Sequence, residues 1–306
     1  MNSISAVGAN GQAQFESQRQ RLRESIEYLP DKPEETASST AVALWLMAAG
    51  RAMSAQQAMQ TDLPALNDVQ SALFDELVAR RLSGVPLAHL TQRQQFMGIE
   101  MLAGPGALVP RRETELLARA AIDLASRCLN EQPTCKVVDV CTGSGNVALA
   151  IAHHLSAVEV HASDLSEEAV ALAARNAVHL ALDSRVTFTA GDLLAAFESE
   201  QFTGQVDVLT CNPPYINSGK VDRMPREIAD HEPRLAFDGG ALGISILMRL
   251  IREAPRFLRP GGWLAFEVGA GQGPALIKRL GATGDYTRVD SVSDETGMVR
   301  VVMARH

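Results

Sequence analysis

The 306-residue sequence has few cysteines, few aromatic residues and no long apolar run. Its cysteines, Cys128, Cys135, Cys141 and Cys211, have the spacing of neither a metal site nor a disulfide framework. We therefore expect reduced thiols in a cytoplasmic protein, with a Cys141–Cys211 disulfide as the less favoured alternative. Because no apolar run reaches the roughly 18 to 20 residues of a membrane-spanning helix, we expect no membrane partner. No metal cofactor is expected either.

The sequence also lacks an excess of positive charge. The net charge is −8 at pH 7, and it is spread along the chain, since residues 1–108 hold 8 basic and 11 acidic residues. Proteins that bind nucleic acid without specificity usually present a basic field, so nucleic acid is disfavoured as a direct substrate. A hydrophobic content of 46% with 21% charged residues is typical of a globular protein. The length allows one large domain or two smaller ones.

The first third of the chain predicts helices. Apolar residues recur at helical spacing over 21–28, 40–53 and 69–82, with polar or proline-containing stretches between them. We therefore predict a small helical domain over 1–95. Weak alternation over 96–102, followed by a turn pattern at Gly104-Pro105-Gly106, predicts a hairpin-like connector over 96–108.

From residue 109 onward, short apolar segments alternate with helical ones. The predicted strands are 136–140, 158–162, 185–189, 206–210 and 262–268, with 286–292 and 298–303 as a closing pair. The predicted helices between them are 147–155, 166–180, 244–257 and 273–280. This alternation predicts an α/β fold with a Rossmann-like, doubly wound parallel sheet over 109–306. Such sheets bind ligands beyond the carboxyl ends of their strands.

A glycine-rich turn follows the first of these strands. The segment is Asp139-Val140-Cys141-Thr142-Gly143-Ser144-Gly145-Asn146, and its glycines permit a close approach of the backbone to a ligand. The second strand ends at Asp164, 25 residues after Asp139, where a carboxylate could accept both ribose hydroxyls. The third strand leads to Gly191-Asp192-Leu193, which we predict to contact an adenine ring and its amine.

Glycine spacing alone does not choose between a dinucleotide and S-adenosylmethionine, because Gly143, Gly145 and Ala148 loosely fit the dinucleotide pattern. Asp139 favours S-adenosylmethionine, since a carboxylate just before the turn suits a cationic ligand better than a pyrophosphate. We predict a cofactor site for S-adenosylmethionine, with S-adenosylhomocysteine as its product. Its residues are Asp139, Cys141, Thr142, Gly143, Ser144, Gly145, Asp164, Leu165, Asp192, Leu193 and Asn212.

The segment Asn212-Pro213-Pro214-Tyr215, at the end of the fourth strand, carries the predicted chemistry. The Asn212 amide oxygen and a nearby main-chain carbonyl can each accept one N–H of a planar amide or amine. The prolines fix φ near −65° and remove two backbone donors, so these carbonyls stay out of a helix. Tyr215 supplies a ring face for the substrate. We predict these four residues to be catalytic and the tips of the first and fourth strands to be adjacent.

Together these motifs resemble those of Rossmann-like methyltransferases that modify exocyclic or amide nitrogens. Three further segments are similar to those of the HemK/PrmC family. They are Leu82-Ser83-Gly84-Val85-Pro86-Leu87-Ala88-His89, Leu108-Val109-Pro110-Arg111-Arg112-Glu113-Thr114-Glu115 and His231-Glu232-Pro233-Arg234-Leu235-Ala236-Phe237-Asp238-Gly239-Gly240. The sequence departs from the family pattern at Arg112, where proline is usual.

This resemblance implies methylation of the glutamine amide in the Gly-Gly-Gln motif of peptide chain release factors, with residues 1–95 recognising the substrate. Alternatives are a paralogue that methylates another amide-bearing molecule, or an enzyme acting on adenine or guanine amines in nucleic acid. Glu113 and Glu115 either stabilise a helix start or line the ligand pocket. We expect His231 to lie in a structural turn, and we assign no chemistry to Glu267.

Overall fold

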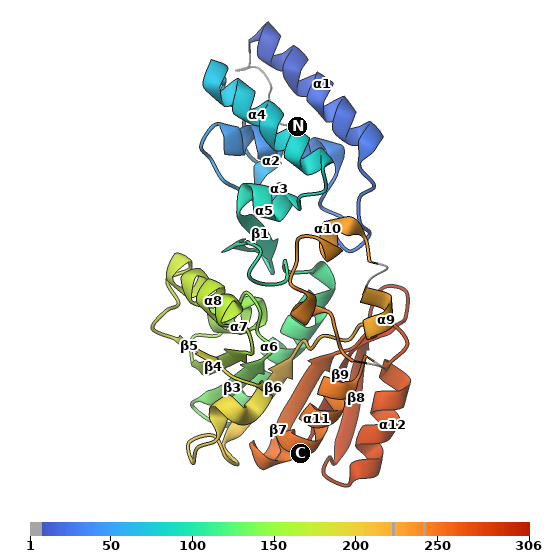
Figure 1. Ribbon diagram of the computed structural model, residues 1–306. Coiled ribbons are helices and arrows are strands. Elements are labelled where there is room, and N and C mark those ends of the chain that lie inside the picture. Colours follow the sequence, from blue (N-terminus) through green and yellow to red (C-terminus); the bar gives the residue numbers. More distant parts are fainter. Residues whose placement is uncertain (1–7, 222–223, 241–242) are drawn as a thin grey trace. The chain divides into compact units, whose positions relative to one another are not determined.

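The computed structural model describes residues 8–221, 224–240 and 243–306 (Figure 1). These residues divide into two compact units. We call residues up to Pro105, together with Val109–Arg111 and Pro225–Glu232, the N-terminal unit. We call Gly106–Leu108, Arg112–Met224 and Pro233–His306 the sheet unit. No helix in the described ranges is both long and apolar enough to cross a bilayer.

The N-terminal unit is helical, with one small hairpin. Its helices are α1 (Ala9–Ser25), α2 (Ala37–Ala48), α3 (Ala55–Ala58), α4 (Asp68–Leu82), α5 (Leu87–Thr91) and α10 (Arg226–Ala229). Capping boxes begin α2 at Thr36 and α4 at Asn67, which satisfies backbone N–H groups that a helix start leaves unpaired. Phe15, Trp45 and Phe74 pack in the core, with the Trp45 ring centroid 5.7 Å from that of Phe15 and 5.1 Å from that of Phe74.

The predicted helix over 69–82 is confirmed as α4. The predicted 40–53 coincides with α2 except that the helix ends at Ala48, and the predicted 21–28 overlaps α1 only over 21–25, because α1 begins at Ala9 and ends at Ser25. The short helices α3 and α5 were not predicted, because four or five residues cannot display a helical period. A hairpin forms between β1 (Arg93–Phe96) and β2 (Ile99–Leu102), and the predicted turn at Gly104-Pro105-Gly106 is present just after it. The hairpin itself reverses at Met97-Gly98, where both residues have positive φ.

The sheet unit confirms the predicted α/β fold (Figure 1). Over its described residues the sheet has seven strands in the order β5-β4-β3-β6-β7-β9-β8. The strands are β3 (Cys135–Val140), β4 (Val158–Asp164), β5 (Val186–Ala190), β6 (Val206–Cys211), β7 (Leu258–Glu267), β8 (Arg288–Ser293) and β9 (Val299–Arg305). The first five in chain order pair in parallel, whereas β9 is antiparallel to both β7 and β8.

Over its described residues, the sheet unit contains the helices α6 (Glu115–Glu131), α7 (Asn146–His154), α8 (Glu167–His179), α9 (Ser218–Val221), α11 (Ser245–Glu253) and α12 (Gly273–Thr283). The four helices predicted between the strands are present as α7, α8, α11 and α12, although α11 ends at Glu253, before the predicted end at 257. The sheet unit also contains α6, which precedes β3, and the short α9, which was not predicted. Short 3-10 turns form at η2 (Arg112–Thr114), η3 (Leu193–Phe197), η4 (Arg234–Ala236) and η5 (Ala254–Arg256). All six residues of β6 are buried, which agrees with its nearly continuous apolar sequence and its central place.

The strand order reverses direction between β3 and β6. From β3 the chain proceeds outward to β4 and β5, and it then returns to β6 on the other side of β3. Val140 at the end of β3 lies opposite Cys211 at the end of β6. The predicted adjacency of these two strand tips is therefore confirmed. Open α/β sheets bind ligands at such a reversal, just beyond the carboxyl ends of the strands.

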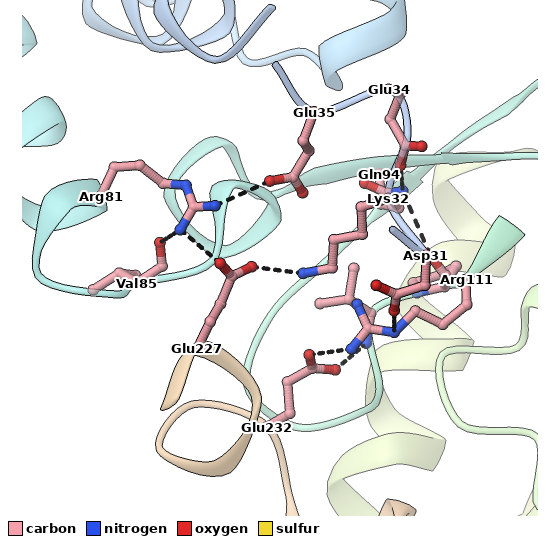
Figure 2. Close-up of polar contacts among 12 residues, drawn as sticks. Asp31, Lys32, Glu34, Glu35, Arg81, Val85, Gln94, Arg111, Glu227 and Glu232 are labelled. Atoms are coloured by element: carbon pink, nitrogen blue, oxygen red, sulfur yellow. Dashed lines mark hydrogen bonds and ion pairs between the residues drawn. The ribbon is translucent and has the colours of Figure 1, made fainter. Parts of the chain in front are cut away.

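A group of buried and partly buried charged side chains lies within the N-terminal unit (Figure 2). We call it the ion cluster, and it consists of Asp31, Lys32, Glu35, Arg81, Arg111, Glu227 and Glu232. Glu227 lies 2.7 Å from Lys32 Nζ and 2.9 Å from an Arg81 nitrogen. Glu232 pairs with Arg111 and also accepts the Val109 backbone N–H at 2.9 Å. These pairs attach residues 225–232 to helices and loops more than 100 positions earlier in the chain.

Candidate active site

The turn after β3 has the backbone geometry that its glycines suggested. Cys141, Gly143 and Gly145 have φ values of 58°, 56° and 81°. A side chain added at Gly145 would meet Ala173, Leu149 and Phe188 at 3.1–3.2 Å, so glycine there serves close helix packing. At Gly143 an added Cβ would meet nothing within 4 Å. The backbone at Gly143 therefore borders open space, as a ligand-binding turn requires.

Asp139 lies beneath this turn and is 1% exposed. Its two carboxylate oxygens accept hydrogen bonds of 2.6 Å from the hydroxyls of Thr142 and Thr210. Burial raises the pKa of Asp139 to about 6, although both hydroxyl hydrogen bonds oppose that shift. Asp139 thus links the turn to β6. Its predicted attraction for a cationic ligand stays a prediction.

Asp164 lies at the tip of β4 and faces the same turn. Its carboxylate accepts the Gly143 backbone N–H at 2.8 Å and the Ser166 backbone N–H at 2.9 Å. Burial raises the pKa of Asp164 against these backbone hydrogen bonds. The next residue, Leu165, is 57% exposed.

The other predicted cofactor residues divide between surface and interior. Asp192 pairs with Arg249 at 2.9 Å and is partly exposed. Leu193 has a positive φ of 51°, its side chain is buried in the core, and its carbonyl accepts the Ser163 hydroxyl at 3.1 Å. Ser144 is buried, and its hydroxyl has no hydrogen-bond partner among the described residues. The structure thus pairs Thr142 with Asp139 and the adjacent Gly143 with Asp164, so both carboxylates hold the same turn.

Asn212 directly follows β6, and its side-chain amide is oriented by a neighbour. The Asn212 Nδ2 donates to Thr114 Oγ1 at 3.1 Å. Among the described residues, no hydrogen-bond donor contacts the Asn212 Oδ1, and no backbone N–H donates to the Pro213 carbonyl. Two acceptors are thus left at the tip of β6, next to the glycine turn.

Tyr215 is held by several contacts within the sheet unit. Its hydroxyl lies 3.0 Å from Glu113 Oε1 and 3.1 Å from Glu267 Oε1. Its backbone carbonyl accepts a hydrogen bond of 3.1 Å from Gln272 Nε2. Glu113 also pairs with Arg300. Burial and then the charges of Glu267 and Glu113 raise the pKa of the Tyr215 hydroxyl.

Glu267, to which we assigned no chemistry, therefore contacts a predicted site residue. It is 1% exposed at the end of β7, and burial followed by the negative charge of Glu113 raises its pKa to about 7. A carboxylate that ends an otherwise apolar strand, on the edge where ligands bind, is the sequence pattern that could have identified it. Of the two earlier candidates, Glu113 reaches Tyr215, whereas Glu115 pairs with Arg119 at the start of α6.

The four cysteines are free thiols. Cys128, Cys135 and Asp207 bring three possible metal-ligand atoms within 4.8 Å of one another, a group that the sequence spacing did not suggest. Arg259 already pairs with Asp207, and the Lys136 backbone N–H donates to the same carboxylate at 2.7 Å. A cation would compete with the Arg259 guanidinium for that carboxylate.

Several known proteins are similar in sequence to this protein over most of its length. The family model described as "Methyltransferase small domain" matches residues 112–273. A release factor glutamine methyltransferase of Koribacter versatilis is 36% identical over 77% of this chain and 80% of its own. One of Streptomyces coelicolor is 42% identical over 68% of this chain and 73% of its own. The chain belongs to the release factor glutamine methyltransferase family.

Solved structures agree on the fold. The hMettl16 catalytic domain, solved in complex with MAT2A 3'UTR hairpin 6, superposes with a TM-score of 0.54 at 14% identity, covering 75% of this chain and 81% of that one. Human methyltransferase 10 domain containing protein gives a TM-score of 0.50 at 17% identity, covering 76% of this chain and 96% of that one. The chain has a Rossmann-like methyltransferase fold, and it is an S-adenosylmethionine-dependent methyltransferase.

Proposed function

We propose that this protein transfers a methyl group from S-adenosylmethionine to the glutamine side-chain amide of the Gly-Gly-Gln motif in peptide chain release factors. The observation that carries the proposal is the pairing of β3 with β6, with Val140 opposite Cys211. Because of this pairing, the glycine turn and Asn212 both leave the sheet at its point of reversal. The relatives named above act on release factors according to their names, which supports this substrate.

The residues around the glycine turn fit the cofactor. Gly143 offers a backbone with open space beside it, and Asp164 is already oriented by the Gly143 and Ser166 N–H groups. We assign Thr142, Gly143 and Asp164 to the cofactor, together with the neighbouring Cys141, Ser144, Gly145, Leu165, Asp192 and Leu193. When bound, S-adenosylmethionine supplies an electrophilic methyl group. Asp139 would hold Thr142 in position through the hydrogen bond that its carboxylate accepts from the Thr142 hydroxyl.

The tip of β6 would hold the substrate amide. An amide nitrogen is a weak nucleophile, because its lone pair is delocalised into the carbonyl. The Asn212 Oδ1 and the Pro213 carbonyl would each accept one N–H, which orients the nitrogen and favours positive charge on it. Correct orientation of reacting groups can supply about 7–11 kcal/mol of rate acceleration. The rings of Pro214 and Tyr215 would support the flat amide.

The N-terminal unit would contribute recognition of the protein substrate. Residues 1–95 hold a helical core of their own, formed around Phe15, Trp45 and Phe74. We assign substrate recognition to these residues. We also assign the protein to the cytoplasm, the compartment of its proposed release-factor substrate.

The test is a methyl-transfer assay with purified release factor and isotopically labelled S-adenosylmethionine, followed by mass mapping of the product. Label is expected on the glutamine of the Gly-Gly-Gln motif. The matched control is a release factor in which that glutamine is replaced by alanine, and it should take up no label. Label on another residue, or on RNA added in place of the release factor, would contradict the proposed substrate.

A further inference from the structure

The Tyr215 hydroxyl lies between two carboxyl groups. A tyrosine hydroxyl carries a single proton, so it can donate one full hydrogen bond. The Tyr215 hydroxyl oxygen lies 3.0 Å from a carboxylate oxygen of Glu113 and 3.1 Å from one of Glu267. If both carboxyl groups were ionised, the two acceptors would have to share that proton. A second proton on one of the two carboxyl groups would make both contacts full hydrogen bonds.

The surrounding charges decide which carboxyl group holds it. Glu113 is partly exposed and pairs with Arg300, so its negative charge is balanced. Glu267 is buried, and its second oxygen, Oε2, has no hydrogen-bond partner among the described residues. The charged or titratable groups recorded around Glu267 are Glu113 on η2, Tyr215 after β6 and Arg300 on β9. One cation for two carboxylates leaves a net negative charge, and protonation of Glu267 removes it.

We propose that Glu267 is a positioning residue for the methyl-transfer reaction, and that its carboxyl group carries a proton in the active protein. The Glu267 carboxyl donates to the Tyr215 hydroxyl oxygen, the Tyr215 hydroxyl donates to Glu113, and Glu113 pairs with Arg300. This chain of contacts fixes the Tyr215 ring on which the substrate amide lies. The inference rests on the proposed function, since the role of Tyr215 belongs to it.

Other contacts restrict Tyr215 in the same way. Gln272 Nε2 holds its backbone carbonyl, and Gln272 Oε1 accepts the Gly269 backbone N–H at 2.9 Å. A Cβ added at Gly269 would lie 3.0 Å from Cδ2 of the Tyr215 ring. The main chain and one edge of the ring are therefore fixed, and the hydroxyl end depends on the two carboxyl groups. Loss of the Glu267 proton would place two negative charges at that end, and the ring would turn away from them.

The consequence is a pH dependence that one substitution removes. Burial and the charge of Glu113 raise the pKa of Glu267 to about 7, so its proton is lost as the pH rises past neutrality. The wild-type kcat is expected to fall above that pH, by about tenfold for each further pH unit. Glutamine at position 267 donates an N–H at every pH. We therefore expect Glu267→Gln to keep kcat within about threefold at pH 6.5 and to show no decline.

Two measurements test the proposal. The first is a titration of the side-chain carboxyl resonances in ¹³C-glutamate-labelled protein without ligand, with Glu267→Gln identifying the resonance. A midpoint near pH 7 is expected, and a midpoint below about pH 5 would overturn the proposal. The second is kcat and KM against pH for the wild type and Glu267→Gln. A decline of kcat in the variant that parallels the wild type would also overturn it.

The controls separate this proposal from the proposed function. Glu198→Gln changes an exposed carboxylate that pairs with Arg256, and it should leave the pH profile unchanged. Glu267→Leu has similar bulk and no donor, and it should lower kcat at every pH. A protein that methylates no glutamine at any pH would contradict the proposed function, while the resonance titration would still decide the protonation of Glu267.

Discussion

Buried carboxylates in this molecule are of two kinds, and the clearest example of each lies in a different unit. In the ion cluster of the N-terminal unit, Glu227 contacts both Lys32 and Arg81, and Glu232 contacts Arg111 (Figure 2). Burial would raise the pKa of Glu227, but these two cations lower it further than burial raises it. In the sheet unit, Asp139 has hydroxyl partners, and Glu267 shares Arg300 with Glu113. Burial prevails there, and it raises the pKa of Asp139 to about 6 and that of Glu267 to about 7.

This difference separates a structural from a functional use of charge. Glu227, which contacts two cations, has a lowered pKa and attaches one segment of chain to another. Buried acids that lack cations hold protons near neutral pH, which is common at catalytic sites. Glu35 is an intermediate case, because burial raises its pKa even though Arg81 lies 3.2 Å away. The balance between burial and neighbouring cations thus differs from one carboxylate to the next, and it is not set by the unit in which the carboxylate lies.

The largest expected effect on stability lies in the ion cluster. Arg81 is 2% exposed, and it contacts Glu35 and Glu227 at 3.2 and 2.9 Å. Replacing Arg81 with methionine leaves Glu35 without that partner and Glu227 with Lys32 alone. We expect Arg81→Met to lower the free energy of unfolding by about 3–5 kcal/mol, measured by denaturant titration.

Arg119→Met is the matched control, because Arg119 forms an exposed ion pair with Glu115. It should cost less than about 1 kcal/mol. Equal losses in the two variants would show that the ion cluster contributes no more than a surface pair. The comparison between the units would then fail.

The second prediction concerns the sign of a pH effect. The pKa of Asp139 is raised from 3.8 to about 6 in the folded state, so the folded state binds this proton more tightly than the unfolded state does. Its contribution to stability is therefore present below pH 4 and is lost as the pH rises through about 6. Asp139→Asn should remove this pH dependence. As the pH rises from 4 to above 6, the free energy of unfolding of the variant should increase relative to that of the wild type by up to about 3 kcal/mol.

Glu227→Gln makes the same chemical change in the ion cluster. The pKa of Glu227 is lowered, so its contribution to stability is present at neutral pH and is lost as the pH falls through the folded-state pKa. As the pH falls, the free energy of unfolding of the wild type should therefore decrease more than that of Glu227→Gln. The same pH slope for both variants, from denaturant titrations at a series of pH values, would contradict the comparison.

Much of the sheet unit was predictable because its determinants are local. An apolar run followed by a glycine turn or by Asn-Pro-Pro defines a strand and its tip within about ten residues, and parallel pairing brings such tips to one edge. Asn212, Gly143 and Asp164 were predicted to be site residues in this way. Thr114 was not, because its hydrogen bond to Asn212 joins residues 98 positions apart.

The charge pairs were beyond prediction for the same reason. Glu227 and Lys32 are 195 positions apart, and nothing in either neighbourhood identifies the other. The position of Glu267 at the end of an apolar strand could have suggested a site residue, but nothing near it in the sequence identifies Tyr215 or Glu113 as its partners. The hairpin turn at Met97 was missed because a nonglycine residue adopts a positive φ there, against its local preference. Local patterns thus defined the elements, while the partners of buried charges depended on the complete fold.

A small expected effect on stability, and a clear one on rate, comes from Asn212. Its amide nitrogen donates to Thr114, and its amide oxygen would accept the substrate N–H. Asn212→Ala should bind S-adenosylmethionine with little change and transfer methyl at least about tenfold more slowly, which corresponds to about 1.4 kcal/mol of barrier. The lost hydrogen bond should lower the free energy of unfolding by only about 1 kcal/mol. Single-turnover rates and cofactor titration measure the first two quantities. Because Arg81→Met should change stability far more than Asn212→Ala does, a large unfolding penalty in the asparagine variant, or an undiminished rate, would show that this residue serves the fold and not the reaction.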